Sequence, residues 1–150
     1  MTPRRKARSL AVQVLYELDF QPRDAEDVVR ERLAGVTLNE ENRQFVTDLV
    51  HGVLHHREEI DARIATAAPQ WPIDQIAHVD KNVLRLAIYE LMFDNSAPAK
   101  VAISEGIELA RLFGSAASPK FVNGVLGAVA EALPNDDSSR RSDMAGKEVK

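Results

Sequence analysis

Apolar residues recur at intervals of three and four along most of this 150-residue chain, which is the period of α-helices that bury one face. The strict alternation of apolar and polar residues that is typical of half-buried strands does not occur. Aromatic residues, which strands favour, make up only 5% of the sequence. We therefore expect an all-α protein, a compact helical domain of six or seven helices.

Proline and glycine residues divide this periodic sequence into separate helices. Pro3 suits the first turn of a helix over residues 4–20, and Gly35 ends a second helix over 25–34. Further helices are expected at 39–67, at 81–93 with Asp80 as the N-cap, at 98–113, and from Ser118 to Pro134, with a short turn at 73–77. Short connections of this kind are typical of helix bundles.

The periodic pattern stops at Pro134, and residues 135–150 are polar and charged. We expect one domain over 1–134, long enough for a real core, and a disordered tail over 135–150. The chain has no cysteine, so it has neither a disulfide framework nor a thiolate metal site. No apolar run is long enough for a membrane span, which favours a cytoplasmic protein with no membrane contact.

Basic residues gather at the N-terminus, although the chain as a whole is acidic. The net charge of -4 argues against a protein whose entire surface coats nucleic acid. Arg4, Arg5, Lys6 and Arg8 fall within five residues. If nucleic acid is the partner, its binding is therefore confined to a local patch.

The first candidate binding surface is the first helix. At 100° per residue, Arg5, Arg8 and Tyr16 fall on one flank beside the apolar stripe, and Arg4 borders that flank. A guanidinium group bonds phosphate with two parallel donors, and a tyrosine ring offers a base a flat face. The alternative is an exposed basic helix start without a ligand, since runs of like charge are usually solvated.

The second candidate is the start of the last helix, where Lys120, Phe121 and Asn123 lie together. An aromatic ring beside a cation and an amide can stack a base and hydrogen-bond its edge. The alternative is that Phe121 belongs to the edge of the core, because large apolar side chains are mostly buried.

No pattern of catalytic or metal-binding residues is found. His51 and His55 are one helical turn apart, with His56 adjacent, but they lack the HExxH pattern and a third ligand, so we interpret them as surface histidines. Glu105 and Glu108 come with no nucleophile or base. We expect no catalytic residue, no metal and no cofactor, and therefore a protein that is not an enzyme.

Three glycines stand inside expected helices, namely Gly106, Gly124 and Gly127. The absence of a side chain lets another backbone or side chain approach closely. We therefore predict that these glycines permit close packing between helices rather than binding of a ligand.

Five segments of the chain, in order and at matching spacing over about residues 4–133, resemble the NusB (N-utilisation substance B) family. They read RRKAR followed by AVQVLY at 4–16, LVHGV at 49–53 with Ile60-Asp61, VDKNVLRLA followed by YEL at 79–91, the segment 98–110, and KFVNGVL at 120–126. The first and last segments are the most specific.

The resemblance implies a NusB-like fold of two small helical bundles and a role in transcription antitermination. It implies binding of the boxA RNA of ribosomal RNA leader transcripts, a complex with the ribosomal small-subunit protein that acts as NusE, and loading onto RNA polymerase. The family's RNA contacts match Arg4, Arg5, Arg8, Tyr16, Lys120 and Phe121. Gln13 matches too, but its helical angle points away from Arg8.

Some details stay open at this point. Asp80 is a candidate contact of the protein partner, although N-capping explains it equally well. Residues 115–117 read Ser-Ala-Ala where relatives often carry acidic residues. Both a monomer and a homodimer fit the family. The alternatives are the NusB-like RNA-binding domain of an RNA cytosine methyltransferase, a helical bundle that binds only proteins, and a small hydrolase that uses Glu or His.

Overall fold

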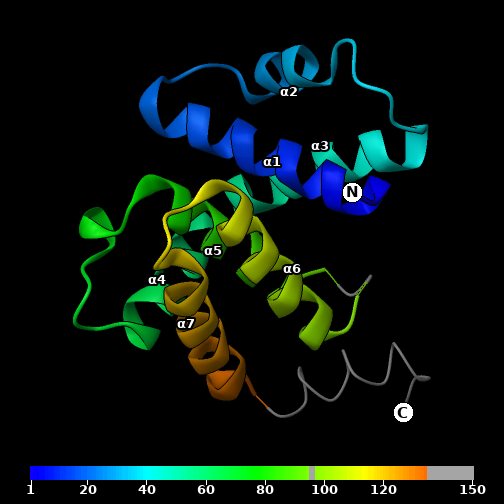
Figure 1. The fold of residues 1–150 in the computed structure, drawn as a ribbon. Helices are drawn as coiled ribbons and strands as arrows, with labels where there is room; N and C mark the ends of the chain where they lie inside the picture. The colour runs from blue at the N-terminus through cyan, green and yellow to red at the C-terminus, as the bar shows by residue number, and fades with distance from the viewer. Residues whose placement is uncertain (95–96, 135–150) are drawn as a thin grey trace.

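The computed structural model describes residues 1–94 and 97–134, and these ranges contain seven α-helices, one short 3-10 helix and no strand (Figure 1). The all-α prediction is therefore confirmed. The predicted tail, 135–150, lies outside the described residues. In chain order the elements are α1 (Pro3–Phe20), α2 (Ala25–Leu33), α3 (Glu40–His55), α4 (Arg57–Ala67), the 3-10 helix η1 (Ile73–Gln75), α5 (His78–Met92), α6 (Ala99–Phe113) and α7 (Ser118–Ala132).

The helices form two small bundles that share a central helix. Helices α1, α2 and α3 pack on one another, and α4, α5, α6 and α7 form the second group, below the first in Figure 1. Helix α5 packs against helices of both bundles, and ten of its fifteen residues are buried. The expected two-bundle arrangement is thus confirmed, with α5 as the element that joins its halves. None of the helices described is long and apolar enough to cross a bilayer.

The single long helix expected at 39–67 is wrong, because the chain forms two helices that meet at His56. The backbone of His56 is not helical, with φ -106° and ψ 19°. Helix α3 packs mainly on α1 in one bundle and α4 on α7 in the other, so the chain must turn between them. No proline stands at the break, and packing of the two bundles, rather than local sequence, ends α3 there.

Two helix starts also differ from the sequence-based expectation. Helix α5 begins at His78 with Ala77 as its N-cap, so Asp80 lies inside the first turn and does not cap the helix. Ser118 is the first residue of α7 rather than its cap. Its Oγ accepts a hydrogen bond from the backbone N–H of Ser115 at 2.9 Å, and this bond closes the connection between α6 and α7.

A buried ion pair joins α1 to α5 near the start of α1. Nε and Nη2 of Arg8 donate to the two carboxylate oxygens of Glu90 at 2.9 and 2.8 Å. Both side chains are almost completely buried. Burial acts to lower the pKa of Arg8, but the hydrogen bonds and charge of Glu90 outweigh it and raise that pKa. Arg8 therefore stays charged inside the protein, beside the carboxyl group of Glu90.

A second buried group, the Asp19 cluster, joins the other end of α1 to α5 and α4. The Asp19 carboxylate accepts a hydrogen bond from Asn82 at 2.8 Å and lies 3.2 Å from both His78 Nδ1 and Arg85 Nη1. Arg85 also donates to both oxygens of Asp61 on α4, at 2.9 and 3.0 Å. Burial acts to raise the pKa of Asp19, but the hydrogen bonds from Asn82 and His78 and the charge of Arg85 together lower it.

Removal of one charge of the Arg8–Glu90 pair should be costly. In a Glu90→Gln variant the Arg8 guanidinium stays buried beside a neutral amide, and the free energy of unfolding should fall by about 3–5 kcal/mol. The matched control is Glu108→Gln, which removes the partner of Arg111 in an exposed pair and should cost less than about 1 kcal/mol. Urea unfolding of the three proteins measures both values. Equal stabilities of the two variants would contradict this account.

The Asp19 cluster should make the fold sensitive to acid. The pKa of Asp19 is lower in the folded chain than its ordinary value of 3.8, so its stabilising effect is present above that value. The effect is lost as the pH falls through the lowered pKa. Urea unfolding between pH 7 and pH 2 should therefore show Asp19→Asn to be less stable than the wild type at pH 7, with a gap that narrows below about pH 4. A stability difference that stays constant over this range would refute the lowered pKa of Asp19.

Candidate nucleic-acid interface

The basic start of α1 is not one exposed flank. Arg8 is 4% exposed and paired with Glu90, so the prediction that it lies beside the apolar stripe on an accessible surface is wrong. Its helical angle places it at the edge of the stripe, and a buried carboxylate on α5 holds its charged end inside. Tyr16, by contrast, is 39% exposed, as expected for that flank.

Arg4 and Arg5 are half-buried and bound to neighbouring helices. Nε and Nη2 of Arg5 donate to Glu105 on α6 at 2.9 and 3.0 Å, which raises the pKa of Arg5 and lowers that of Glu105. Nη1 of Arg4 donates to Asn42 on α3 at 2.9 Å, and its guanidinium lies 3.7 Å from the centre of the Phe45 ring. Each guanidinium has five donor hydrogens, so neither arginine uses all of its donors in these bonds.

Aromatic rings gather at the other end of α1. The ring of Tyr16 lies 4.9 Å from that of Phe20, and Phe20 lies 4.4 Å from the His78 ring on α5. Phe20 is 56% exposed, and sequence analysis missed it, although the spacing of four residues from Tyr16 places both rings on one helix face. A row of exposed rings of this kind suits stacking with nucleobases.

Tyr16 also lies beside the end of α6. A small cavity of about 130 Å³ is lined by Val12, Gln13 and Tyr16 of α1, Arg32 of α2, Val79 of α5 and Phe113 of α6. Gln13, which the helical angle set apart from Arg8, thus shares a cavity with Tyr16, and it accepts a hydrogen bond from Arg32 at 2.8 Å. The surface around Tyr16 therefore continues towards the α6–α7 connection.

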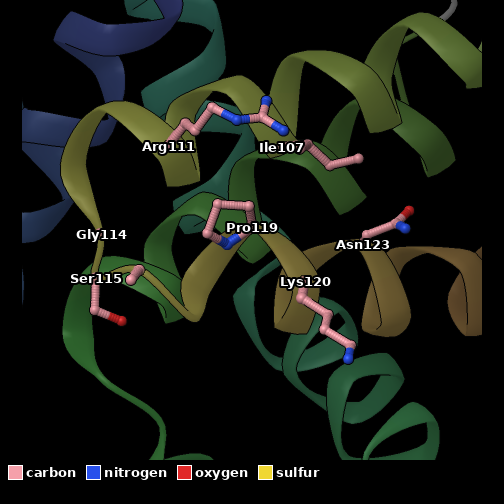
Figure 2. A pocket seen from close by; sticks show the side chains of 8 residues that line it. Ile107, Arg111, Gly114, Ser115, Pro119, Lys120 and Asn123 are labelled. Carbon is pink, nitrogen blue, oxygen red and sulfur yellow. The ribbon is translucent and has the colours of Figure 1, made fainter.

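Two cations border an open cavity between the end of α6 and the start of α7. The cavity holds about 670 Å³, with Arg111 on one side and Lys120 and Asn123 on the other, as Figure 2 shows. Arg111 pairs with Glu108 on its own helix at 2.7 Å in an exposed contact of the kind that contributes little. Sequence analysis missed Arg111, because one basic residue in the last turn of a helix is an ordinary feature.

Phe121 is half-buried, so it is partly accessible for stacking and partly a residue at the edge of the core. One side packs against the core, and the outer edge meets Trp71 with the ring centres 6.1 Å apart and the planes at 80°. Trp71 is 47% exposed and lies in the connection between α4 and η1. No periodicity in that connection pointed to Trp71, and the fold alone brings it to α7.

The predicted residues thus fall into two groups. The end of α1, the α4–α5 connection and the α6–α7 connection lie on the same side of the molecule, at the left of Figure 1. Tyr16, Lys120 and Phe121 belong to this side, and the structure adds Arg111 and Trp71 to it. Arg4 and Arg5 lie near the N-terminus. Along α1 they are roughly 16–18 Å from Tyr16, at a rise of 1.5 Å per residue. Cations interleaved with exposed aromatic rings are the surface chemistry that binds single-stranded nucleic acid.

The remaining candidates are Asp80 and the histidines of α3. Asp80 is half-buried, and its Oδ1 has no hydrogen-bond partner in the part of the chain that the structure describes. Across residues 1–94 and 97–134, no three His, Cys, Asp or Glu side chains come together as a metal site requires. His51 lies 3.9 Å from Glu26 at the surface.

Comparison with known proteins agrees with this geometry. Residues 5–131 match the family described as the NusB family. The chain is 42% identical over 139 residues to the transcription antitermination protein NusB of Dehalococcoides mccartyi strain 195, covering 93% of this chain and 97% of that one. It is 43% identical over 139 residues to the NusB of Geobacter sulfurreducens, covering 90% and 99% of the two chains.

Solved structures show the same fold. The structure of T. maritima NusB superposes with a TM-score of 0.84 at 33% identity, covering 93% of this chain and 99% of the other. A crystal structure of the antitermination factors NusB and NusE in complex with dsRNA superposes with a TM-score of 0.80 at 30% identity, covering 89% and 99%. The NusB-like fold expected from the sequence is therefore confirmed. This chain belongs to the NusB family, whose members are transcription antitermination factors and not enzymes.

Proposed function

We propose that this antitermination factor binds boxA-type single-stranded RNA of ribosomal RNA leader transcripts, together with the ribosomal protein that acts as NusE. The pair then joins the antitermination complex on RNA polymerase in the cytoplasm. The observation that carries the proposal is the cluster of Lys120, Arg111, Phe121 and Trp71 at the start of α7. A relative crystallised with NusE and dsRNA supports both classes of partner.

Different residues are proposed to make different contacts. Lys120 and Arg111 bind phosphate, because they border an open cavity and at most an exposed ion pair must be broken. Tyr16, Phe121 and Trp71 stack on bases. Arg4 and Arg5 contact the strand with their remaining donors, near the N-terminal end of α1. Arg8 acts indirectly, since its buried pair with Glu90 holds α1 in place.

Asp80 is the proposed contact of the ribosomal partner. The residue is half-buried in the first turn of α5, so part of its side chain stays accessible to a partner protein, whereas its Oδ1 is buried inside the chain. Because Asp80 does not cap α5, capping no longer explains its presence at this position.

The proposal is tested by titrating a fluorescently labelled boxA-like RNA with the protein, alone and with the ribosomal partner. Single-stranded and double-stranded forms of the RNA are compared, because the related complex contains dsRNA. We expect tighter binding of the single strand, strengthened by the partner. Failure to bind either RNA at micromolar protein, with the partner present, would refute the proposed function.

Charge contacts should be visible in the salt dependence. Lys120→Ala removes one phosphate contact, so the slope of log affinity against log salt should fall by about one, for every RNA sequence. The control is Lys100→Ala, an exposed lysine at the opposite end of α6 from Arg111, which should leave the slope unchanged. A lower slope in the control as well would indicate a diffuse charge effect instead of a site.

Stacking contacts should leave the salt slope unchanged. Trp71→Ala should weaken RNA binding by about 1–3 kcal/mol at an unaltered slope. Phe121→Ala should weaken binding and also lower the thermal stability, because that ring packs against the core. Thermal unfolding of the same samples separates the two effects. Normal RNA affinity in both variants would show that these rings are only structural.

A further inference from the structure

Gly124 stands in the middle of α7, where a glycine destabilises a helix relative to alanine. A Cβ added to Gly124 would meet nothing within 4 Å, and the same holds for Gly127. At Gly106 a Cβ would lie 2.9 Å from Leu126, and at Gly52 only 2.2 Å from Tyr89. The prediction that these glycines permit close packing between helices is thus confirmed for Gly106 and wrong for Gly124 and Gly127. Nothing in the part of the chain described here requires glycine at position 124.

The position of Gly124 on α7 gives it a neighbour on each side. At 100° per residue, Lys120 and Gly124 lie on the outer face of the helix, opposite the buried residues Val122 and Val129. On one side of this face, Asn123 lines the cavity that Lys120 shares with Arg111. On the other side, Phe121 meets Trp71. The outer surface at Gly124 therefore separates the pair of cations from the pair of aromatic rings.

We propose that the bound RNA strand crosses α7 directly over Gly124, in contact with the helix backbone. This rests on the proposed function and adds the path of the strand. A strand whose phosphates are bound by Arg111 and Lys120 and whose base stacks on Trp71 and Phe121 joins the two pairs by passing over the outer face of α7.

The missing side chain brings the strand closer to the helix. A sugar or phosphate over Gly124 can contact the helix backbone, and a methyl group at this point would push it outward. The charge along α7 fixes where the strand crosses. Lys120 attracts phosphate one turn before Gly124, whereas Glu131, on the same exposed face two turns after it, repels phosphate. The strand therefore crosses near the start of α7 and does not follow the helix.

The test is the Gly124→Ala variant, with Gly127→Ala as its matched control. Both substitutions replace an internal helix glycine whose Cβ would be in open space, so each should raise the Tm by about 2–4 °C. In titrations with labelled boxA-like RNA, Gly124→Ala should weaken the affinity by about five- to tenfold. Gly127→Ala should bind like the wild type. A variant that folds more stably but binds RNA less well separates binding from folding.

Other outcomes would overturn the proposal. Wild-type RNA affinity in both alanine variants would show that the strand does not approach Gly124, while leaving the proposed function in place. Equal weakening in both would show that the strand runs along α7. Unchanged RNA affinity with weaker binding of the ribosomal partner would assign this face to a protein. If the wild type itself binds no RNA, the proposed function fails, and the proposed path of the strand over Gly124 fails too.

Discussion

The contact between α1 and α5 joins the two bundles, and two buried charged groups lie within its apolar packing. At one end Arg8 pairs with Glu90, and at the other Asp19 receives hydrogen bonds from Asn82 and Arg85. A buried charge is stable only with a partner in good geometry. Each group therefore fixes not only that the two helices meet but also their register along each other, which a purely apolar contact specifies less sharply.

The proposed RNA-binding surface depends on this register because its parts come from both bundles. Tyr16 and Phe20 belong to α1, whereas Lys120 and Phe121 belong to α7 of the second bundle. The Asp19 cluster lies next to the aromatic row, since His78 contacts both Asp19 and Phe20. A displacement of α1 along α5 would move the aromatic rings relative to the cations while each bundle stayed folded. The buried charges thus support the surface without touching a ligand.

Much of the fold could be predicted because the information is local. Pro3 and the glycine and proline residues near 114–119 mark the ends of α1, α6 and α7, and period-3.6 stripes identify their buried faces. The break at His56 could not be predicted, since it results from the assignment of α3 and α4 to different bundles. In the same way, the burial of Arg8 depends on a carboxylate 82 residues away, which no local pattern reveals.

The residues of the candidate site also differ in whether the local sequence or only the fold reveals them. Residues whose chemistry is visible in the sequence, such as Lys120 and Tyr16, were found from composition and helical angle. Arg111 and Trp71 were missed, because their significance comes from the neighbours that the fold gives them. Gly124 was noticed but misinterpreted, since an internal glycine indicates a close approach without saying whether the approaching group belongs to the protein or to a ligand.

The sequence separation within the Arg8–Glu90 pair also has a kinetic consequence. The two residues are 82 positions apart, and closing so long a loop costs entropy before the contact can stabilise the chain, so we expect the pair to form late in folding. An interaction that forms after the transition state changes the rate of unfolding rather than the rate of folding. On this expectation, the pair sets the lifetime of the folded arrangement more than the speed at which it forms.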